Sequence, residues 1–430
     1  MHSSKANKRF SALVRRRGAD YALSALSARW GTMDQSYIAL SIPVFFVLII
    51  AEIVVSRRRG LTVYRTDDAL IDLACGIGSQ AWNALIKVGL AFGFIYIFDN
   101  YRIASLPSDS VWTWVASFVL VDFAYYWWHR WSHEINWLWA AHIVHHQSED
   151  YNLAVALRQA WFTSITATPF YLPLALLGFH LGVIATTITF STLYQFWIHT
   201  QLIDRMGPFE LLFNAPMHHR VHHAINPQYL DKNYAAILIV WDRLFGTYIA
   251  EKEPVVYGLV KPLHSFNPIW VNFHHWVALF KIAGQTQHWR DKIAIFWQPP
   301  YWLPADLPQY PPPPEVTPQT FVRYSVPVSA PLRRYLLMQF LLVAAAVALL
   351  ISRADHLSWP LRCSLALLIW LSLWTWGGLL ESKPWRMYAE SLRLVLVTVG
   401  VGVFVSPAWG AAAAVLCLSQ GLWVRQAVKT

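Results

Sequence analysis

The sequence is poor in charged residues. Only 13% of its 430 residues are Asp, Glu, Lys or Arg, whereas 56% are hydrophobic. Mean hydropathy is +0.35. Soluble globular enzymes need more polar surface than this, so the composition excludes that class and predicts a membrane protein. The 24 tryptophans fit the prediction, because an amphipathic indole favours the headgroup zone of a bilayer.

Cysteine is also scarce. Cys75, Cys363 and Cys417 lie in separate apolar runs, and the sequence contains no CxxC pair. This spacing argues against a disulfide framework and against a thiolate metal site. No DNA- or RNA-binding motif accompanies the net charge of +10. We therefore expect no nucleic-acid partner, and we attribute the positive charge to contact with anionic lipid headgroups.

The basic N-terminal stretch, residues 1–35, lacks an adjacent apolar core followed by a cleavage site. We therefore interpret it as a basic arm and not as a signal peptide.

Long apolar runs occupy much of the remaining chain. About 20 such residues suffice for a helix to cross a bilayer, so the pattern predicts an all-α, multi-pass membrane protein. The run at 392–405 is short for a full crossing, and the run at 160–199 is long enough for two. The runs cover residues 36–55, 69–97, 111–128, 160–199, 335–351, 361–380, 392–405 and 411–424.

The positions of the arginines predict how the helices are oriented in the membrane. Arg57, Arg58, Arg59 and Arg65 follow the first run, which indicates a cytoplasmic loop. Counting the crossings from that loop returns the histidine-rich segments to the cytoplasmic side. The arm with its arginines at 15–17 then falls outside, against the positive-inside tendency. We expect the endoplasmic reticulum membrane in a eukaryote and the inner membrane in a bacterium.

Histidines are the most informative feature, because three boxes have metal-ligand spacing. On a helix, residues three and four apart share one face. Imidazole suits iron, copper and zinc, and these boxes hold more ligands than one zinc ion needs. They predict a polynuclear metal site at a membrane surface. The boxes are His129 and His133, then His142, His145 and His146, and finally His219, His222 and His223, with His199 before the last.

Two stretches carry a resemblance to a known superfamily. They are VDFAYYWWHRWSHEINWLWAAHIVHHQSEDYNLAVALRQ and APMHHRVHHAINPQYLDKNYAAILIVWDRLFGTY. Both resemble the fatty acid hydroxylase/sterol desaturase superfamily and, within it, the alkylglycerol monooxygenase family. We accordingly divide the chain into four parts. These are the arm at 1–35, a membrane hydroxylase core at 36–260, an amphipathic and proline-rich linker at 261–333, and C-terminal transmembrane helices at 334–430.

The resemblance implies a chemistry. The nine histidines named above would hold two iron ions in a cytoplasmic cap. Dioxygen and tetrahydrobiopterin would support cleavage of the ether bond of an alkylglycerol to a fatty aldehyde and a glycerol. Glu134 matches an acidic position of the family, and we expect it to orient an imidazole. Hydroxylase relatives carry a further histidine four residues after His199, where this chain has Ile203.

Several points stay open at this stage. The same core could instead hydroxylate or desaturate a fatty acid, sterol or carotenoid, and a histidine-rich metal transporter is an alternative of another class. No pterin motif is present, although Tyr151, Tyr234 and Trp241 could stack on one. The oligomeric state is open. Asp122 could hold a ligand histidine or only pack helices, and His218, His274 and His275 have no assigned role.

Overall fold

The computed structural model describes residues 34–429. The predicted N-terminal arm therefore lies almost wholly outside the described residues, as do its arginines at 15–17. Within the described part, the chain is helical and has no strand, only two isolated bridges between Phe213 and Leu238 and between Ala224 and Tyr257. The predicted all-α class is confirmed.

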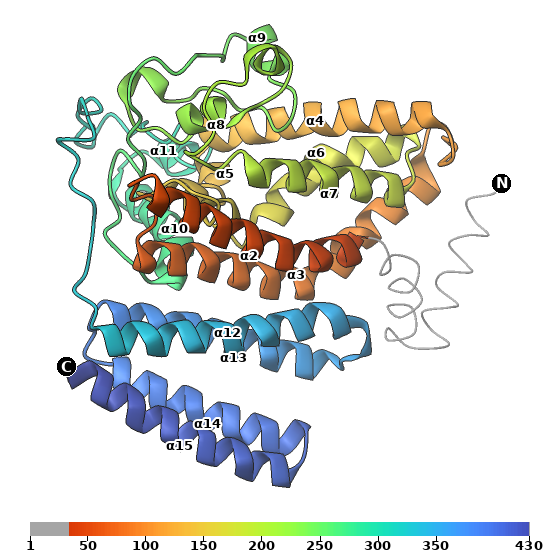
Figure 1. Ribbon diagram of the computed structural model, residues 1–430. Coiled ribbons are helices and arrows are strands. Elements are labelled where there is room, and N and C mark those ends of the chain that lie inside the picture. The colour runs from red at the N-terminus through yellow and green to blue at the C-terminus, as the bar shows by residue number, and fades with distance from the viewer. Residues whose placement is uncertain (1–33, 430) are drawn as a thin grey trace.

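Every predicted apolar run is helical over most of its length. These helices are roughly parallel and stack in layers, with the α14–α15 pair outermost (Figure 1). Among the described residues, α3, α12, α13, α14 and α15 are long and apolar enough to cross a membrane. The multi-pass prediction is thus confirmed. The bounds are α2 Asp34–Arg58, α3 Thr66–Tyr101, α4 Val111–Glu134, α6 Thr163–Leu177, α7 Leu181–Trp197, α12 Ala330–Arg353, α13 Trp359–Leu380, α14 Arg386–Phe404 and α15 Pro407–Lys429.

Two predictions about these runs need correction. α14 begins at Arg386 and is long enough to cross, because the buried pair of Glu390 and Arg393 lets the helix include polar residues. Arg393 Nε donates to Glu390 Oε2 at 2.8 Å. The run at 160–199 forms two helices of 15 and 17 residues, each shorter than a full crossing of about 20 residues.

The short α6–α7 hairpin nevertheless reaches the end of the bundle away from the histidines. Its turn contains Gly178 at φ +104°, where a Cβ would lie 2.1 Å from the carbonyl oxygen of Ala104. The Ile103 N–H donates to the Leu176 carbonyl at 2.8 Å. Only glycine permits this close approach to the connection between α3 and α4.

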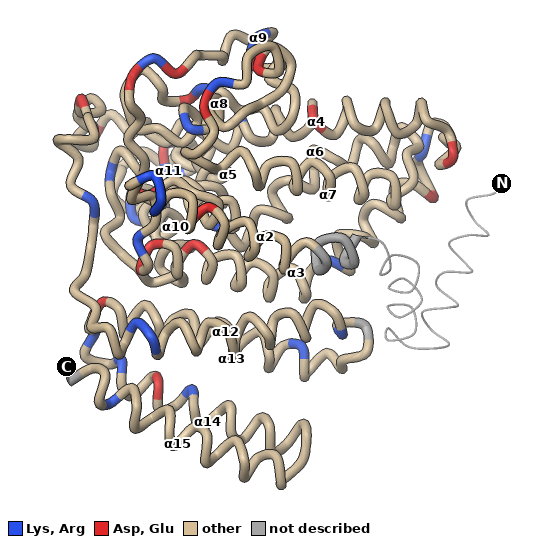
Figure 2. Tube along the Cα trace, in the orientation of Figure 1, with Lys and Arg blue, Asp and Glu red and all other residues tan. Residues whose placement is uncertain are grey.

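Short helices and irregular segments form a cap at the other end of the bundle (Figure 1). Charged residues gather in this cap and beside it, whereas long stretches of α12 to α15 carry few (Figure 2). The cap elements are α5 Asn136–Ala140, η1 Ile143–His146, η2 Val155–Leu157, η3 Gly207–Leu211, α8 Pro216–His222, η4 Pro227–Tyr229, α9 Val240–Leu244, α10 Pro268–Gln285 and α11 Trp289–Ala294. A further turn, η5 Ala354–His356, joins α12 to α13.

The largest apolar core joins α3, α12 and α13 to the underside of the cap. Ile71, Tyr335 and Trp376 are fully buried in it, and Val144 of η1 belongs to the same cluster. Because burial of apolar area is the main stabilising term, this core fixes the height of η1 above the bundle. The second histidine box is thereby attached to the transmembrane helices.

Candidate metal centre

The three histidine boxes come from three kinds of backbone. His129 and His133 lie on the last turns of α4, as the spacing predicts. The second box is not an α-helix, which corrects our expectation. His142 precedes the 3₁₀ turn η1, which holds His145 and His146. His145 and His146 are consecutive in this turn, so their side chains point about 120° apart, and His142 lies before the turn in a non-helical conformation. The box therefore does not present one common face.

The histidines converge into two buried groups. In each group, one ligand atom per residue lies within 4.8 Å of all the others. All nine predicted residues are included, and His145 separates from its neighbours to join the second group. The groups adjoin, because the rings of His146 and His223 stack with centroids 4.3 Å apart. The first group is His129, His133, His142, His146 and His222, and the second is His145, His199, His219 and His223.

The spacing of the nitrogens fits a bound metal. His129 Nε2 lies 3.0 Å from His142 Nε2, and His199 Nε2 lies 3.0 Å from His219 Nε2. Nitrogens bound to one ion at about 2.1 Å are separated by about 3.0 to 3.4 Å. A neutral imidazole has one N–H, so hydrogen bonds cannot satisfy a ring of facing nitrogens. His222 Nε2, for example, is buried without a partner.

Backbone carbonyls hold the outer nitrogens of four of these rings. Each carbonyl accepts from Nδ1–H, so that the Nε2 lone pair faces the group. This arrangement sets the tautomer and ring direction of a metal-ligating histidine. The acceptors are Tyr234 O for His129 at 2.7 Å, Arg158 O for His145 at 3.1 Å, Gln195 O for His199 at 2.7 Å and Lys232 O for His222 at 3.0 Å.

Burial keeps the imidazoles neutral. It lowers the pKa of all nine histidines, and in most of them neighbouring imidazoles lower it further. The pKa of His145 falls to about 4 and that of His222 to about 3. At neutral pH the rings are therefore in the form that binds metal, since a protonated imidazole has no free lone pair.

A loop with unusual backbone geometry supplies the Lys232 carbonyl. Asp231 and Asn233, on either side, have φ of 58° and 56°, a left-handed conformation that Asp and Asn tolerate better than most residues. The Asn233 amide donates to the Ile249 carbonyl at 2.8 Å and so fixes the loop. These residues support the metal centre through the backbone.

Asp242 supports the Tyr234 carbonyl, which accepts from His129. Asp242 was not identified from the sequence. Its carboxylate accepts the N–H groups of Tyr234 and Ala235, both at 2.8 Å. It is fully buried and also accepts from Thr247. Asp242 therefore fixes the Tyr234 carbonyl that holds His129. An acidic residue directly after the apolar segment AAILIVW was the signal available in the sequence.

Two further buried charged residues, Arg158 and Glu52, hold the segments that carry histidines of the second group. Arg158 Nη1 donates to Asp72 at 2.9 Å while its own carbonyl holds His145. Glu52 of α2 accepts from Thr200, the neighbour of His199, at 2.5 Å and from the Leu153 N–H at 2.8 Å. A carboxylate within an apolar run, as at Glu52, was the sequence signal in that case.

Glu134 does not make the contact that we expected. It pairs with Arg130 at 2.8 Å and is bonded to no histidine among the described residues. The reason is its position on α4, one residue beyond His133, which turns it about 100° away from the ligand face. The carboxylate closest to that ring is Asp231, whose Oδ1 lies 3.8 Å from His133 Nδ1.

The three histidines that had no assigned role lie outside both groups. His218 accepts from the Ala215 N–H and packs on Tyr248. His274 contacts the Val271 carbonyl. His275 bonds Asn136 at 3.1 Å, which ties α10 to α5.

The other open positions also have structural partners. Asp122 accepts from the N–H groups of Ile237 and Leu238 and from the Trp241 indole, so it anchors a cap loop and holds no ligand histidine. Tyr151 stacks on Tyr257 with ring centroids 4.8 Å apart.

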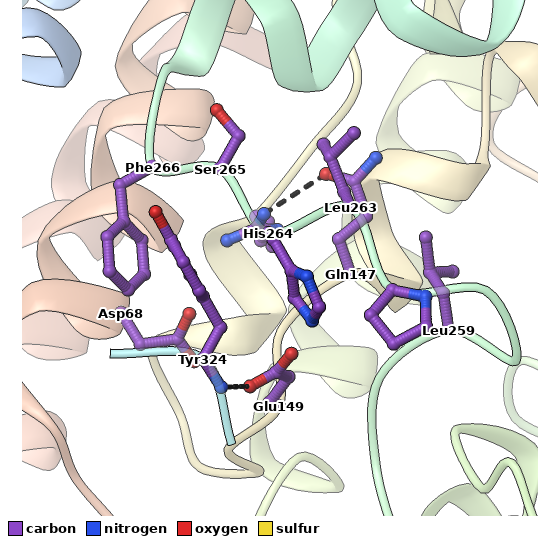
Figure 3. A pocket seen from close by; sticks show the side chains of 11 residues that line it. Asp68, Gln147, Glu149, Leu259, Leu263, His264, Ser265, Phe266 and Tyr324 are labelled. Carbon is purple, nitrogen blue, oxygen red and sulfur yellow. Dashed lines mark hydrogen bonds between the residues drawn. The ribbon is translucent and has the colours of Figure 1, made fainter. Parts of the chain in front are cut away.

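A small polar cavity adjoins η1 (Figure 3). Asp68, Glu149, His264 and Tyr324 line it together with Gln147, the residue after His146. Its volume of about 20 Å³ admits one or two water molecules. That is too small for the two fused rings of a pterin, so the cavity does not identify pterin-binding residues.

A buried histidine centre at one end of a transmembrane bundle defines a class, the histidine-box membrane hydroxylases. Consistent with this class, residues 114–247 match the family "Fatty acid hydroxylase". The matched segment contains all three boxes and the loop up to Asp242. No solved structure matches the chain.

Three relatives narrow the class. The "Alkylglycerol monooxygenase" of Homo sapiens is 39% identical over 87% of this chain and 85% of its own length. The proteins of that name from Xenopus tropicalis and Caenorhabditis elegans are 38% and 32% identical, over 84% and 79% of this chain and 81% and 72% of their own lengths. The chain therefore belongs to the alkylglycerol monooxygenase family within the fatty acid hydroxylases, as the sequence resemblance predicted.

Proposed function

We propose that this protein is a di-iron membrane monooxygenase that cleaves the ether bond of alkylglycerols. The products are a fatty aldehyde and a glycerol, and tetrahydrobiopterin donates the electrons. The observation that carries the proposal is the convergence of nine neutral histidines into two adjoining groups, in a chain that matches alkylglycerol monooxygenases over most of its length.

The two histidine groups would each hold one iron ion. In the proposal, the five histidines around His129 and His222 hold the first ion, and the four around His199 and His219 hold the second. Such a pair of ions supplies dioxygen activation for hydroxylation of the carbon beside the ether oxygen, after which the resulting hemiacetal collapses to aldehyde and alcohol.

The chain itself contributes positioning and a neutral donor set. Backbone carbonyls fix the rings, and Asp242, Arg158 and Glu52 fix the segments that carry those carbonyls. In this proposal Glu134 acts on the ligand His133 indirectly, through Asp231. Burial, together with the charge of Glu134, raises the pKa of Asp231, and Asp231 Oδ1 lies 3.8 Å from His133 Nδ1. A carboxylate near a ligand ring raises the basicity of that ring.

We further propose that the metal centre faces the cytoplasm. Among residues 34–429, basic residues at the cap ends of the helices outnumber those at the opposite ends, which supports this orientation under the positive-inside rule. The cap-end residues are Arg57, Arg58, Arg59, Arg65, Arg333, Arg334, Lys383, Arg386 and Arg425, against Arg102, Arg353 and Arg362 at the opposite end.

A metal transporter is less well supported. Its ligands would follow one another along a path across the bilayer, whereas the two histidine groups adjoin at one end of the bundle.

The test is reconstitution of the purified protein with Fe(II) without oxygen, followed by addition of an alkylglycerol, tetrahydrobiopterin and dioxygen. We expect about two irons per chain and fatty aldehyde whose formation requires the pterin. His218→Ala is the matched control, because His218 is buried beside His219 but lies outside both groups. If the protein binds two irons but forms no aldehyde, the alkylglycerol assignment is contradicted and the assignment of the metal centre is retained.

A further inference from the structure

The linker helices α10 and α11 have one face that no described part of the protein covers. Phe280 is 65% exposed, Trp289 66% and Trp297 61%. Trp270, Val277 and Ile293 are also exposed. The rings of Phe280 and Phe296 lie 5.3 Å apart, so α10 and the segment after α11 form one continuous surface. We call these six exposed residues, Trp270, Val277, Phe280, Trp289, Ile293 and Trp297, the aromatic face.

The position of α10 shows that it runs across the ends of the transmembrane helices. At its start, Asn267 packs on Gly377, near the last turn of α13, where a Cβ would lie 2.5 Å from the Asn267 Cα. Eight residues later, His275 bonds Asn136 at the start of α5. α10 also contacts α3. A helix that passes from one layer of the bundle to another lies nearly parallel to the membrane plane.

The start of α10 is also at the height where the spans end. The Ser265 hydroxyl donates to Glu381, the residue directly after α13, at 2.6 Å. Arg333, near the start of α12, lies 3.8 Å from Asp67 at the start of α3. Asp68, also at the start of α3, lines the same small cavity as Ser265 and Phe266. One end of each of three candidate spans therefore lies near the first turn of α10, which sets this helix at the boundary between hydrocarbon and headgroups.

The charges around the aromatic face match a lipid surface. Lys281, Arg290 and Lys292 are exposed among these aromatic residues, and Asp291 is the one acidic residue between 268 and 298. Exposed tryptophans together with basic residues are the composition of helices that lie in a membrane interface. We propose that the aromatic face is buried in the headgroup layer of the membrane that the protein spans, with a preference for anionic lipids.

The opposite side of α10 connects this surface to the metal centre. Gln147, which follows His146, donates through its side chain to the Val271 carbonyl at 3.2 Å. Asn272 accepts from the Trp161 N–H at 3.0 Å. The membrane contact thus holds down a helix on which the second histidine box rests.

The test is lipid quenching of a bimane label on the full-length protein in nanodiscs. Cys363 is replaced by serine, and labels are placed by Phe280→Cys and Trp297→Cys, since Cys75 and Cys417 are buried. Leu367→Cys, on the exposed surface of α13, gives the lipid reference. Lys252→Cys, exposed in the cap, gives the aqueous reference. We expect brominated phospholipid to quench positions 280 and 297 nearly as well as 367 and several-fold more than 252.

Iodide and lipid charge distinguish the other outcomes. Quenching of 280 and 297 by iodide and not by lipid would show that the face is in water. Quenching by neither would show that protein covers it. Either result overturns the proposal. Brominated phosphatidylglycerol should quench position 297 more than brominated phosphatidylcholine does, and K281E/R290E/K292E should remove that difference. Equal quenching by both lipids before the charge reversal would refute the anionic preference.

Discussion

The cap and the C-terminal helices bury polar groups for different purposes. In the cap, buried polar side chains bind irregular backbone, as Asp242 and Asn233 do, and so aim carbonyls at imidazoles. In α12 to α15, the main buried polar network joins side chains to one another across regular helices. There Arg393 donates to Glu390 and to Gln339, and Gln339 donates to Gln420.

This difference shows what each region requires. Helices form from local hydrogen bonds and an apolar surface, so α12 to α15 need a polar network only to fix their register. A centre built from residues far apart in sequence needs backbone that leaves the helix at set points, and that backbone must be held by side chains. We therefore expect substitutions in the two regions to separate chemistry from stability, and we order them by their effect on the metal centre.

The largest effect should come from removal of one imidazole in each group. We expect His222→Ala and His219→Ala each to lower bound iron from about two to about one per chain. Turnover should fall by more than about 100-fold, because loss even of a group that only supports a ligand costs about 10- to 100-fold. Iron analysis and aldehyde formation measure both. Full iron content in either variant would contradict the two-group assignment.

The next largest effect should follow Asp242→Ala. The N–H groups of Tyr234 and Ala235 would lose their buried acceptor, and the Tyr234 carbonyl would no longer be fixed against His129. We expect about a 10- to 100-fold loss of iron affinity and a lower melting temperature. Asp204→Ala is the control, since the Asp204 side chain is 95% exposed. Equal iron affinity in the two variants would contradict the support that we assign to Asp242.

A smaller effect is expected for Glu134→Gln, because Glu134 acts through Asp231 and not by direct contact. We expect turnover to fall by about 10-fold at most, because Glu134 is separated from the His133 ring by Asp231. Two irons per chain should be retained. Arg130→Met is the matched variant, since it breaks the same surface pair and leaves the carboxylate. If both variants lose turnover equally, the ion pair and not the charge of Glu134 is what matters.

The smallest effect on the centre, with a large effect on stability, should come from Arg393→Met. This change leaves Glu390 charged and buried without its partner, which typically costs about 3 to 5 kcal/mol. Iron per folded chain should stay near two. The double variant E390Q/R393M should recover much of the stability, as followed by thermal unfolding in detergent. Loss of iron from the folded single variant would show that the two regions are coupled.

The sequence predicted what depends on local pattern. Apolar length located the helices, histidine spacing identified eight of the nine residues that converge, and the family resemblance supplied His199. The sequence could not predict that η1 is a 3₁₀ turn preceded by a non-helical His142, or that His145 joins a different group from His142 and His146, because the spacing i, i+3, i+4 is compatible with more than one backbone conformation. It could not predict the partners of Asp122, since these depend on which loop returns to α4. Arg158 and Asp242 were missed for the same reason. The i, i+4 spacing of Arg130 and Glu134 was, by contrast, a local signal for their ion pair.

The order of the histidines along the chain has a consequence for biosynthesis. All nine precede residue 224, whereas α12 begins at Ala330 and contributes none. A ribosome therefore delivers the complete donor set about a hundred residues before the first of the last four helices. Domains generally fold in the order in which they emerge. We therefore expect iron to bind before the C-terminal helices are made, and a chain ended by a stop codon after residue 329 is the species in which to detect it.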